Sequence, residues 1–319
     1  MKLGLGATLV VCAGMTAQAT SFYLTVAGSG GEPDYEQRFA AWASDAGKAL
    51  AKEPNAKVET LSGKDATKAN IQAKLTAIAG AAKADDTFTL LIIGHGTYDD
   101  IDYKAEIPDH DISATELAAA LDKIAARQVV VLATSASAGA TPKLQKDRRV
   151  VITATKSGAE KNATVFARFW VQALGDPAAD TDKNQTLTAL EAFKYAEAKT
   201  ASYFTDLKRL ATEHPLLEDT GKGEGVKDPS AANGKGIIAG RFPLMHLGTA
   251  ENLANNPAKQ ALLKRKDELE TQVDELKYRK AAMDLPTYNN QMRQLLLELA
   301  KVQASLDDPS TAPAPVRAK

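Results

Sequence analysis

The stretch QVVVLATSASAGA, residues 128–140, decides the fold class. Its β-branched run, 129–132, carries no charge, which is typical of a strand buried on both faces of a sheet. The run ends in small residues and two hydroxyl side chains, Ser135 and Ser137, as expected of a loop. In open α/β sheets, ligands bind at the carboxyl ends of such strands. The pattern therefore indicates a functional loop that follows a buried strand.

Similar apolar runs alternate with helical patterns along most of the chain. Strands are predicted over 22–28, 58–61, 88–93, 129–132 and 150–155, and helices over 33–50, 66–82, 113–126, 164–174 and 188–203. Asp65 is a predicted N-cap, and Ser113 is predicted to form a capping box with Glu116. The alternation predicts an α/β domain over 20–247, with a mostly parallel sheet covered by helices on both faces.

The composition is that of a globular protein. The chain has 319 residues, of which 44% are hydrophobic and 25% are charged. This length is sufficient for a sizeable core and an accessory unit. Lysine and arginine number 39 and aspartate and glutamate 40, so the net charge is −1. Such a balance gives no electrostatic basis for binding nucleic acid, and we expect none.

Residues 1–19 are predicted to be a secretory signal peptide. Lys2 precedes an apolar stretch, 3–15, and 17–19 is an A-x-A cleavage site. Cleavage would export the chain to the periplasm or the extracellular space without a transmembrane anchor, and a lipid-modified or retained signal is the alternative. Because Cys12 is the single cysteine, the mature chain would have no disulfide and no thiol nucleophile.

The C-terminal part is predicted to be a helical hairpin over 248–308. Two apolar series have coiled-coil spacing: Leu262, Leu269, Leu276 and Met283, and then Tyr288, Met292, Leu295, Leu299, Val302 and Leu306. Pro286 separates the two series, which favours two antiparallel helices. A structural prop, a contact between two copies and a site for a helical partner at 257–306 all remain open. The proline-rich tail, 309–319, is predicted to be disordered.

His95 is a candidate general base. It follows an apolar strand and lies between Gly94 and Gly96, where the backbone can approach closely. Ser135 follows the next strand along the chain. If a right-handed crossover makes the two strands neighbours, both residues open on the same edge of the sheet, as a base and a nucleophile require. A hydrogen-bonding histidine and a tight turn of small residues are the alternative interpretation.

Several segments resemble the caspase/legumain group of cysteine peptidases. The first three are LLIIGHGTYDD (90–100), PDHDISATELAAAL (108–121) and QVVVLATSASAGA (128–140). The segments RVVITATKSGAEKN (149–162) and ATEHPLLEDTGKG (211–223) further resemble bacterial legumain-like chains. The resemblance covers the predicted α/β domain, excludes the hairpin, and implies a peptidase-related fold that binds a peptide or protein in its cleft.

The resemblance implies that His95 is the base and that Ser135 occupies the position of the nucleophilic cysteine. Ser137 falls on a serine of the family motif and Ala138 on its glycine. A thiol is partly ionised at neutral pH, whereas a hydroxyl needs a well-aligned base. We therefore expect an impaired peptidase homologue that acts in binding or scaffolding. An active hydrolase with a Ser135–His95 dyad is the alternative.

A twelve-residue segment has the ligand spacing of an EF-hand calcium loop. The positions of the oxygen ligands are Asp180, Asp182, Asn184, Thr186, Thr188 and Glu191. Gln185 stands where that loop usually has glycine, at a sharp turn with an unfavourable backbone conformation. We predict a Ca²⁺ site, with a polar loop that caps the next helix as the alternative. A calcium-stabilised adaptor that acts through the hairpin is a third candidate function.

The remaining motifs carry less chemistry. His110, His214 and His246 have no partners at metal-ligand spacing and are interpreted as structural or surface residues. The glycine turn 28–31 follows a strand and precedes a helix, as in phosphate-binding loops, but the dinucleotide fingerprint is incomplete. Apart from the calcium ion, no cofactor is therefore expected.

Overall fold

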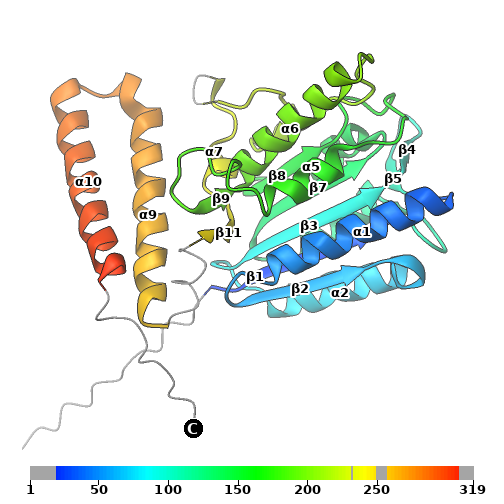
Figure 1. Ribbon diagram of the computed structural model, residues 1–319, viewed down its shortest axis with the longest axis horizontal. Coiled ribbons are helices and arrows are strands. Elements are labelled where there is room, and N and C mark those ends of the chain that lie inside the picture. The colour runs from blue at the N-terminus through cyan, green and yellow to red at the C-terminus, as the bar shows by residue number, and fades with distance from the viewer. Residues whose placement is uncertain (1–18, 231–232, 249–256, 309–319) are drawn as a thin grey trace, which may run out of the picture.

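The computed structural model describes residues 19–230, 233–248 and 257–308, and it shows an α/β domain beside a helical hairpin (Figure 1). A six-stranded sheet has the order β10-β8-β7-β3-β1-β2. These strands are β1 (Ser21–Ala27), β2 (Ala56–Leu61), β3 (Thr87–Gly94), β7 (Arg127–Thr134), β8 (Arg149–Thr153) and β10 (Leu216–Glu218). All neighbours pair in parallel except β10, which runs antiparallel to β8. The expected fold class is confirmed, while residues 1–18 of the predicted signal peptide 1–19 and the predicted tail 309–319 lie outside the described residues.

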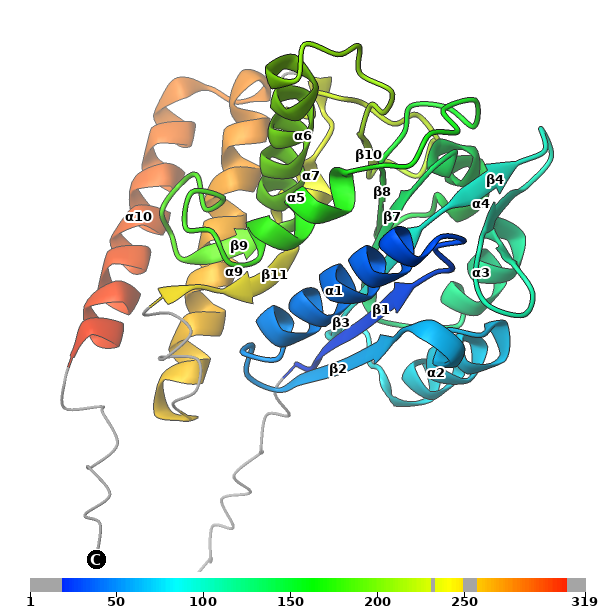
Figure 2. The ribbon, with the colours of Figure 1, turned by 45° about the vertical axis from the view of Figure 1, so that its right-hand side comes forward.

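Helices cover both faces of this sheet (Figure 2). One face packs against α1 (Pro33–Leu50), α5 (Phe166–Ala173), α6 (Ala189–Asp206) and α7 (Ile237–Gly240). The other packs against α2 (Lys68–Ala81), α3 (Ala114–Leu121) and α4 (Thr141–Leu144). Val129 and Val131 of β7 belong to the first hydrophobic cluster, and Val130 and Leu132 belong to the second. Burial on both faces therefore explains why this run contains no polar residue.

Two small antiparallel sheets lie outside the six-stranded sheet. The first contains β4 (Gly96–Tyr98), β5 (Tyr103–Ala105) and β6 (Ile112–Ser113), and the second contains β9 (Thr186–Thr188) and β11 (Pro243–His246). In Figures 1 and 2, β4 and β5 lie at the end of the molecule away from the hairpin, whereas β9 and β11 lie beside it. Sequence patterns did not predict these strands, because two to four residues are too few to show periodicity.

One predicted helix cap is confirmed and one is wrong. The backbone N–H of Glu116 donates to the Ser113 hydroxyl over 3.1 Å, and the N–H of Ser113 donates to the Glu116 carboxylate over 2.9 Å. Asp65 does not cap α2, because it ends a 3₁₀ turn, η1 (Gly63–Asp65), that delays the helix. The hydroxyl of Thr67 accepts the capping hydrogen bond instead.

Two antiparallel helices are present within the predicted hairpin range 248–308, of which 249–256 lie outside the described residues. The hairpin consists of α9 (Pro257–Arg279) and α10 (Leu285–Asp307), joined by η4 (Lys280–Ala282), and Asp284 caps α10. The two helices share a cluster of buried leucine and valine side chains: Leu263, Leu269, Val302 and Leu306. Neither of the two clusters on the sheet includes a hairpin residue. Among the described residues, no helix combines the length and the apolarity that crossing a membrane requires.

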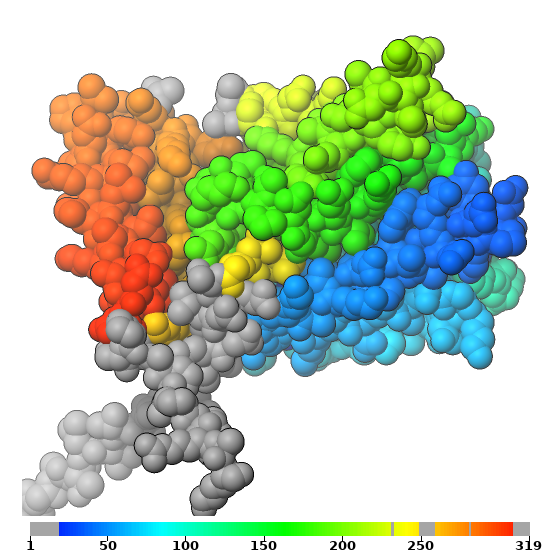
Figure 3. All heavy atoms as spheres, in the orientation of Figure 1, coloured from blue at the N-terminus to red at the C-terminus, as the bar shows by residue number. Residues whose placement is uncertain are grey.

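Polar contacts attach the hairpin to the α/β domain. In the space-filling view, α9 (orange) abuts the green segment that contains β9 (Figure 3). The Lys266 ammonium donates to the carbonyl oxygen of Asn184 over 2.6 Å, and Arg241 forms a 3.0 Å ion pair with Glu275. Charged and hydrogen-bonded groups therefore contribute much of this interface.

His246 links three parts of the chain beside the middle of α9. Its Nδ1 lies 2.9 Å from the Glu53 carboxylate after α1, and its Nε2 lies 3.5 Å from Asp267 on α9. Burial lowers the pKa of His246, but the charge of Asp267 and the hydrogen bond and charge of Glu53 outweigh it and raise that pKa to about 10. The imidazolium thus stabilises the folded state.

We predict that this contribution disappears at alkaline pH. Because the pKa of His246 is raised by folding, the stabilisation is complete below the ordinary value of 6.5 and is lost as the pH rises through about 10. Denaturant unfolding at pH 6 to 10 should show a smaller decline for His246→Gln than for the unmodified chain. His110→Gln is the control, because His110 is exposed. Equal pH dependence in all three chains would contradict the prediction.

Candidate functional site

The structure places His95 and Ser135 at adjacent strand ends. The parallel register of β3 and β7 ends with Gly94 opposite Thr134, and His95 and Ser135 are the next residues on the two strands. Both therefore open on the carboxyl edge of the sheet, where α/β folds bind ligands. The two residues are 40 positions apart in the sequence, and the crossover through α3 brings them to neighbouring strand ends.

The His95 ring packs against aromatic side chains of α1. Its centroid lies 5.0 Å from that of Tyr35 and 5.2 Å from that of Phe39, with both pairs in T-shaped geometry. Within the described residues, neither ring nitrogen of His95 forms a hydrogen bond, so none joins it to Ser135. The ring is half-buried. It is placed by packing and has no polar partner that would orient it as a base.

Ser135 is buried and already hydrogen-bonded. Only 2% of the surface of Ser135 is exposed, and its Oγ accepts a hydrogen bond from the backbone N–H of Gly96 over 3.1 Å. Ala136 follows in a left-handed conformation, with φ of 53°, which makes the sharp elbow after β7. In acyl transfer, an N–H group beside the nucleophile can also stabilise the oxyanion, and the N–H of Gly96 lies in such a position. In this arrangement, however, a substrate has no access to the hydroxyl.

Ser137 connects the elbow to β8. Its Oγ accepts the N–H of Ala154 over 3.0 Å and that of Thr155 over 3.2 Å, and it lies 3.1 Å from the Thr155 hydroxyl. The residue is completely buried. These contacts give Ser137 a structural role at the end of two neighbouring strands.

Acidic residues near the elbow were missed by the sequence analysis. The carbonyl oxygen of Glu160 accepts the N–H of Ala136 over 2.7 Å, and its carboxylate pairs with the His214 ring. Glu213 accepts the N–H groups of Val165 and Phe166 at the start of α5. Burial raises the pKa of Glu213 to about 7, although these hydrogen bonds oppose it. A lone glutamate in a loop has no periodicity that would reveal such a role.

The glycine turn after β1 is filled by its own chain. The Glu36 carboxylate accepts the N–H of Gly30 over 2.7 Å, and a Cβ on Gly30 would collide with the backbone of α1. An anion-binding loop needs such N–H groups to be available for the ligand. The turn therefore gives no support for phosphate binding.

The candidate calcium loop has the backbone that its motif requires. Lys183 and Gln185 have φ of 60° and 67°, so Gln185 makes the left-handed turn that glycine usually supplies. Carboxylate oxygens of Asp180, Asp182 and Glu191 all lie within 4.8 Å of one another. Three carboxylates around one point suit a hard cation such as Ca²⁺, which takes oxygen ligands.

Hydrogen bonds within this loop organise the same carboxylates. Asp180 accepts the N–H of Gln185 over 2.9 Å, and Glu191 accepts those of Thr181 and Thr188 over 2.9 and 3.0 Å. The alternative role, capping of α6, is thus also present. Partial burial and the charges of Glu191 and Asp180 raise the pKa of Asp182 to about 6.

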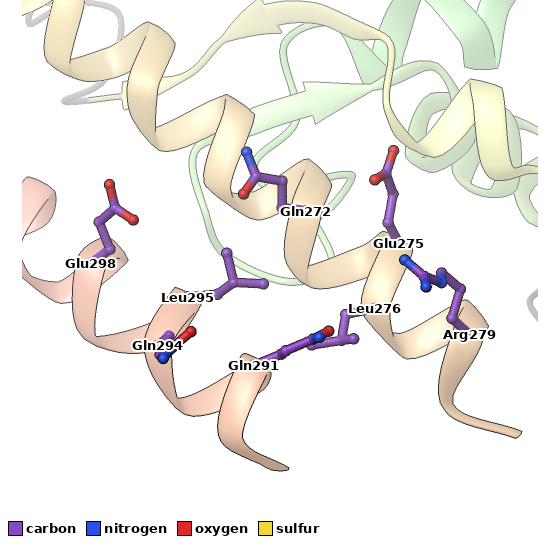
Figure 4. A pocket seen from close by; sticks show the side chains of 8 residues that line it. All are labelled: Gln272, Glu275, Leu276, Arg279, Gln291, Gln294, Leu295 and Glu298. Atoms are coloured by element: carbon purple, nitrogen blue, oxygen red, sulfur yellow. The ribbon is translucent and has the colours of Figure 1, made fainter. Parts of the chain in front are cut away.

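The hairpin offers a groove at the opposite end of the molecule from His95. It has a volume of about 330 Å³ and is lined by Gln272, Glu275, Leu276 and Arg279 of α9 and by Gln291, Gln294, Leu295 and Glu298 of α10 (Figure 4). Leu276 and Leu295 are its apolar residues. The helical partner or second copy expected at 257–306 stays a prediction.

Comparisons with known proteins yield structural neighbours alone. No protein-family model matches the chain, and no curated protein does. A structure from Geobacter sulfurreducens has 15% identity and a TM-score of 0.45, and covers 72% of this chain and 100% of its own. The Drosophila initiator caspase Dronc has 11% sequence identity and a TM-score of 0.43, and the match covers 65% of this chain and 82% of Dronc. The structure of drICE has 10% sequence identity and a TM-score of 0.38, and the match covers 65% of this chain and 90% of drICE. The TM-scores of these three structures are below 0.5, so their likeness assigns no role to this chain.

We predict that Ser137→Ala destabilises the fold. It removes the acceptor of two buried N–H groups, which should cost about 1–3 kcal/mol. Ser157→Ala is the control, because Ser157 is not buried and accepts one local N–H. Chemical unfolding of both variants measures the difference, and equal stabilities would assign Ser137 no structural role.

Proposed function

We propose that this chain is an exported caspase/legumain-like peptidase homologue with impaired catalysis, which acts by binding peptide or protein at its carboxyl edge. The observation that carries the proposal is the buried Ser135 hydroxyl, held by the N–H of Gly96. The caspase-type order of segments, from the strand before His95 to the elbow at Ser135, supports the ancestry.

The chemistry of a hydroxyl supports impaired catalysis. Serine attack requires a base at hydrogen-bond distance, itself oriented by a third group. The His95 ring contacts Tyr35 and Phe39 instead of a polar partner within the described residues. The alternative, an active hydrolase with a Ser135–His95 dyad, would need the Gly96 segment to move away and the ring to turn toward Oγ.

A fluorophosphonate probe that reacts with activated serines tests the proposal. We expect no labelling of Ser135 in the mature chain under conditions that fully label a working serine hydrolase, because the hydroxyl is buried and lacks a base. Ser135→Ala and His95→Ala are the matched controls, analysed by mass spectrometry of the labelled peptide. Labelling of Ser135 that vanishes in His95→Ala would establish the active hydrolase instead.

Calcium binding is a second candidate function. Two observations favour it: the twelve-residue spacing of oxygen ligands from Asp180 to Glu191, and the left-handed turn at Gln185. An exported chain meets abundant calcium, so even the weak affinity of extracellular modules, about 10⁻⁴ to 10⁻³ M, would suffice. Asn184 and Thr186 of the loop hydrogen-bond to Glu270 and Asp267 of α9, so a bound ion would also support the hairpin.

Calorimetric titration of the mature chain with calcium chloride tests this function. We expect binding that weakens as the pH falls through about 6, since protonation of Asp182 competes with the ion. Asp182→Asn should reduce the affinity, whereas Asp206→Asn, an exposed carboxylate at the far end of α6, should not. Absence of heat at millimolar calcium would leave helix capping as the function of the loop.

A further inference from the structure

A glycine-walled slot beside the Ser135 elbow holds the ring of Tyr98. A Cβ on Gly139 would lie 2.5 Å from Cδ2 of Tyr98, and a Cβ on Gly158 would lie 2.6 Å from its Cγ, nearer still to Cδ1. Real Cβ atoms do not approach so closely, so any larger residue at either glycine would displace the ring. The Tyr98 ring therefore packs directly against the backbone at both glycines, and the space there fits the ring only while both residues lack a side chain.

The walls of the slot are the loops that hold Ser135. Gly139 belongs to the turn after the elbow, where its N–H donates to the carbonyl oxygen of Ala136 over 3.0 Å. Gly158 lies two residues before Glu160, whose carbonyl oxygen accepts the N–H of Ala136 over 2.7 Å. Tyr98 itself is two residues after Gly96, the donor to Ser135 Oγ. A ligand at the carboxyl edge would thus meet this slot.

Tyr98 enters the slot from a short hairpin with an exposed tip. β4 and β5 have three residues each, and Ile101 at their turn is 79% exposed. The Tyr103 hydroxyl anchors β5 to the Thr134 hydroxyl over 2.6 Å, whereas Tyr98 is half-buried. Short strands at the surface open at a lower free-energy cost than the buried strands of a core. Withdrawal of Tyr98 would break the pairing of β4 with β5 and the packing of the ring on the second hydrophobic cluster, while the Tyr103–Thr134 hydrogen bond holds β5.

We propose that the slot between Gly139 and Gly158 is a recognition subsite for a flat aromatic side chain of a peptide, and that Tyr98 is its internal occupant. The proposal rests on the proposed binding function of the carboxyl edge. Aromatic side chains bury a large area with few rotatable bonds, and a tyrosine hydroxyl keeps a polar end near solvent. The bound peptide ring would replace that of Tyr98, and the same withdrawal would uncover Ser135.

The test uses p-cresol, the side chain of tyrosine, as the probe. In mature full-length Tyr98→Ala, p-cresol should bind about tenfold more tightly than in the unmodified chain, as measured by NMR titration. The saturated analogue 4-methylcyclohexanol should not bind, because a puckered ring is too thick for the slot. Tyr98→Phe is the matched control and should resemble the unmodified chain. In Tyr98→Ala/Gly158→Ala, the added methyl group should abolish the gain.

Two results would overturn the subsite: equal binding of both probes by Tyr98→Ala, or binding that survives the Gly158→Ala change. If Tyr98→Ala does not fold, amide hydrogen exchange of the unmodified chain decides instead. There, p-cresol should compete with Tyr98 and speed exchange at 96–98, and unchanged exchange would reject the proposal. No peptide is needed in either assay. A slot that binds p-cresol in a chain that binds no aromatic peptide would contradict the proposed function and the peptide ligand, and would leave only the ring-binding slot established.

Discussion

The parallel pairing of β3 with β7 is the constraint on which the candidate site depends. Every residue of β3 is buried, and its apolar side chains alternate between the two hydrophobic clusters, so a one-residue slip of the register would exchange the side chains that pack into each cluster. The register therefore fixes Gly94 opposite Thr134, and with them the positions of His95 and Ser135. The buried pairing of β3 with β7 positions His95 and Ser135, and no contact between the two residues is required. For this reason, the geometry of the edge does not depend on which atom stands at the end of the residue 135 side chain.

Hydrogen bonding at this edge favours a stable structure over reactivity. The Ser135 hydroxyl accepts an amide N–H and lies out of solvent, which satisfies a buried polar group at little cost. A thiol in the same position would accept that hydrogen bond only weakly, whereas the hydroxyl oxygen of Ser135 is a good acceptor. The hydrogen bond therefore holds the Gly96 segment against Ser135. Tyr98, two residues further on, fills the space between Gly139 and Gly158.

The sequence predicted those features that depend on local pattern. Uncharged β-branched runs identified the buried strands, the Ser113–Glu116 spacing identified a capping box, and the twelve-residue motif anticipated the unfavourable turn at Gln185. Features that depend on distant contacts were missed. The pairing of β9 with β11 joins segments about 57 positions apart, and such short strands acquire their register from packing, not from periodicity. The predicted Asp65 cap was wrong because Asp65 ends a 3₁₀ turn, and the helix starts only after Thr67. The same polar residues are common in 3₁₀ turns and at helix N-caps, so the sequence pattern does not distinguish them.

The loop from Asp180 to Glu191 and the helix α9 place like charges against each other. Burial, with the charges of Asp267 and Asp182, raises the pKa of Glu270 to about 7 despite the 3.1 Å ion pair of Glu270 with Lys266. The pKa of Asp182 is raised as well, to about 6. Ionisation of both carboxylates therefore costs free energy in the folded state. A proton or a divalent cation in the loop lowers that repulsion, and the Lys266 ammonium already does so in part. Attachment of the hairpin is therefore coupled to the charge of this loop, at the end of the molecule away from His95, so the two candidate functions act through separate parts of the fold.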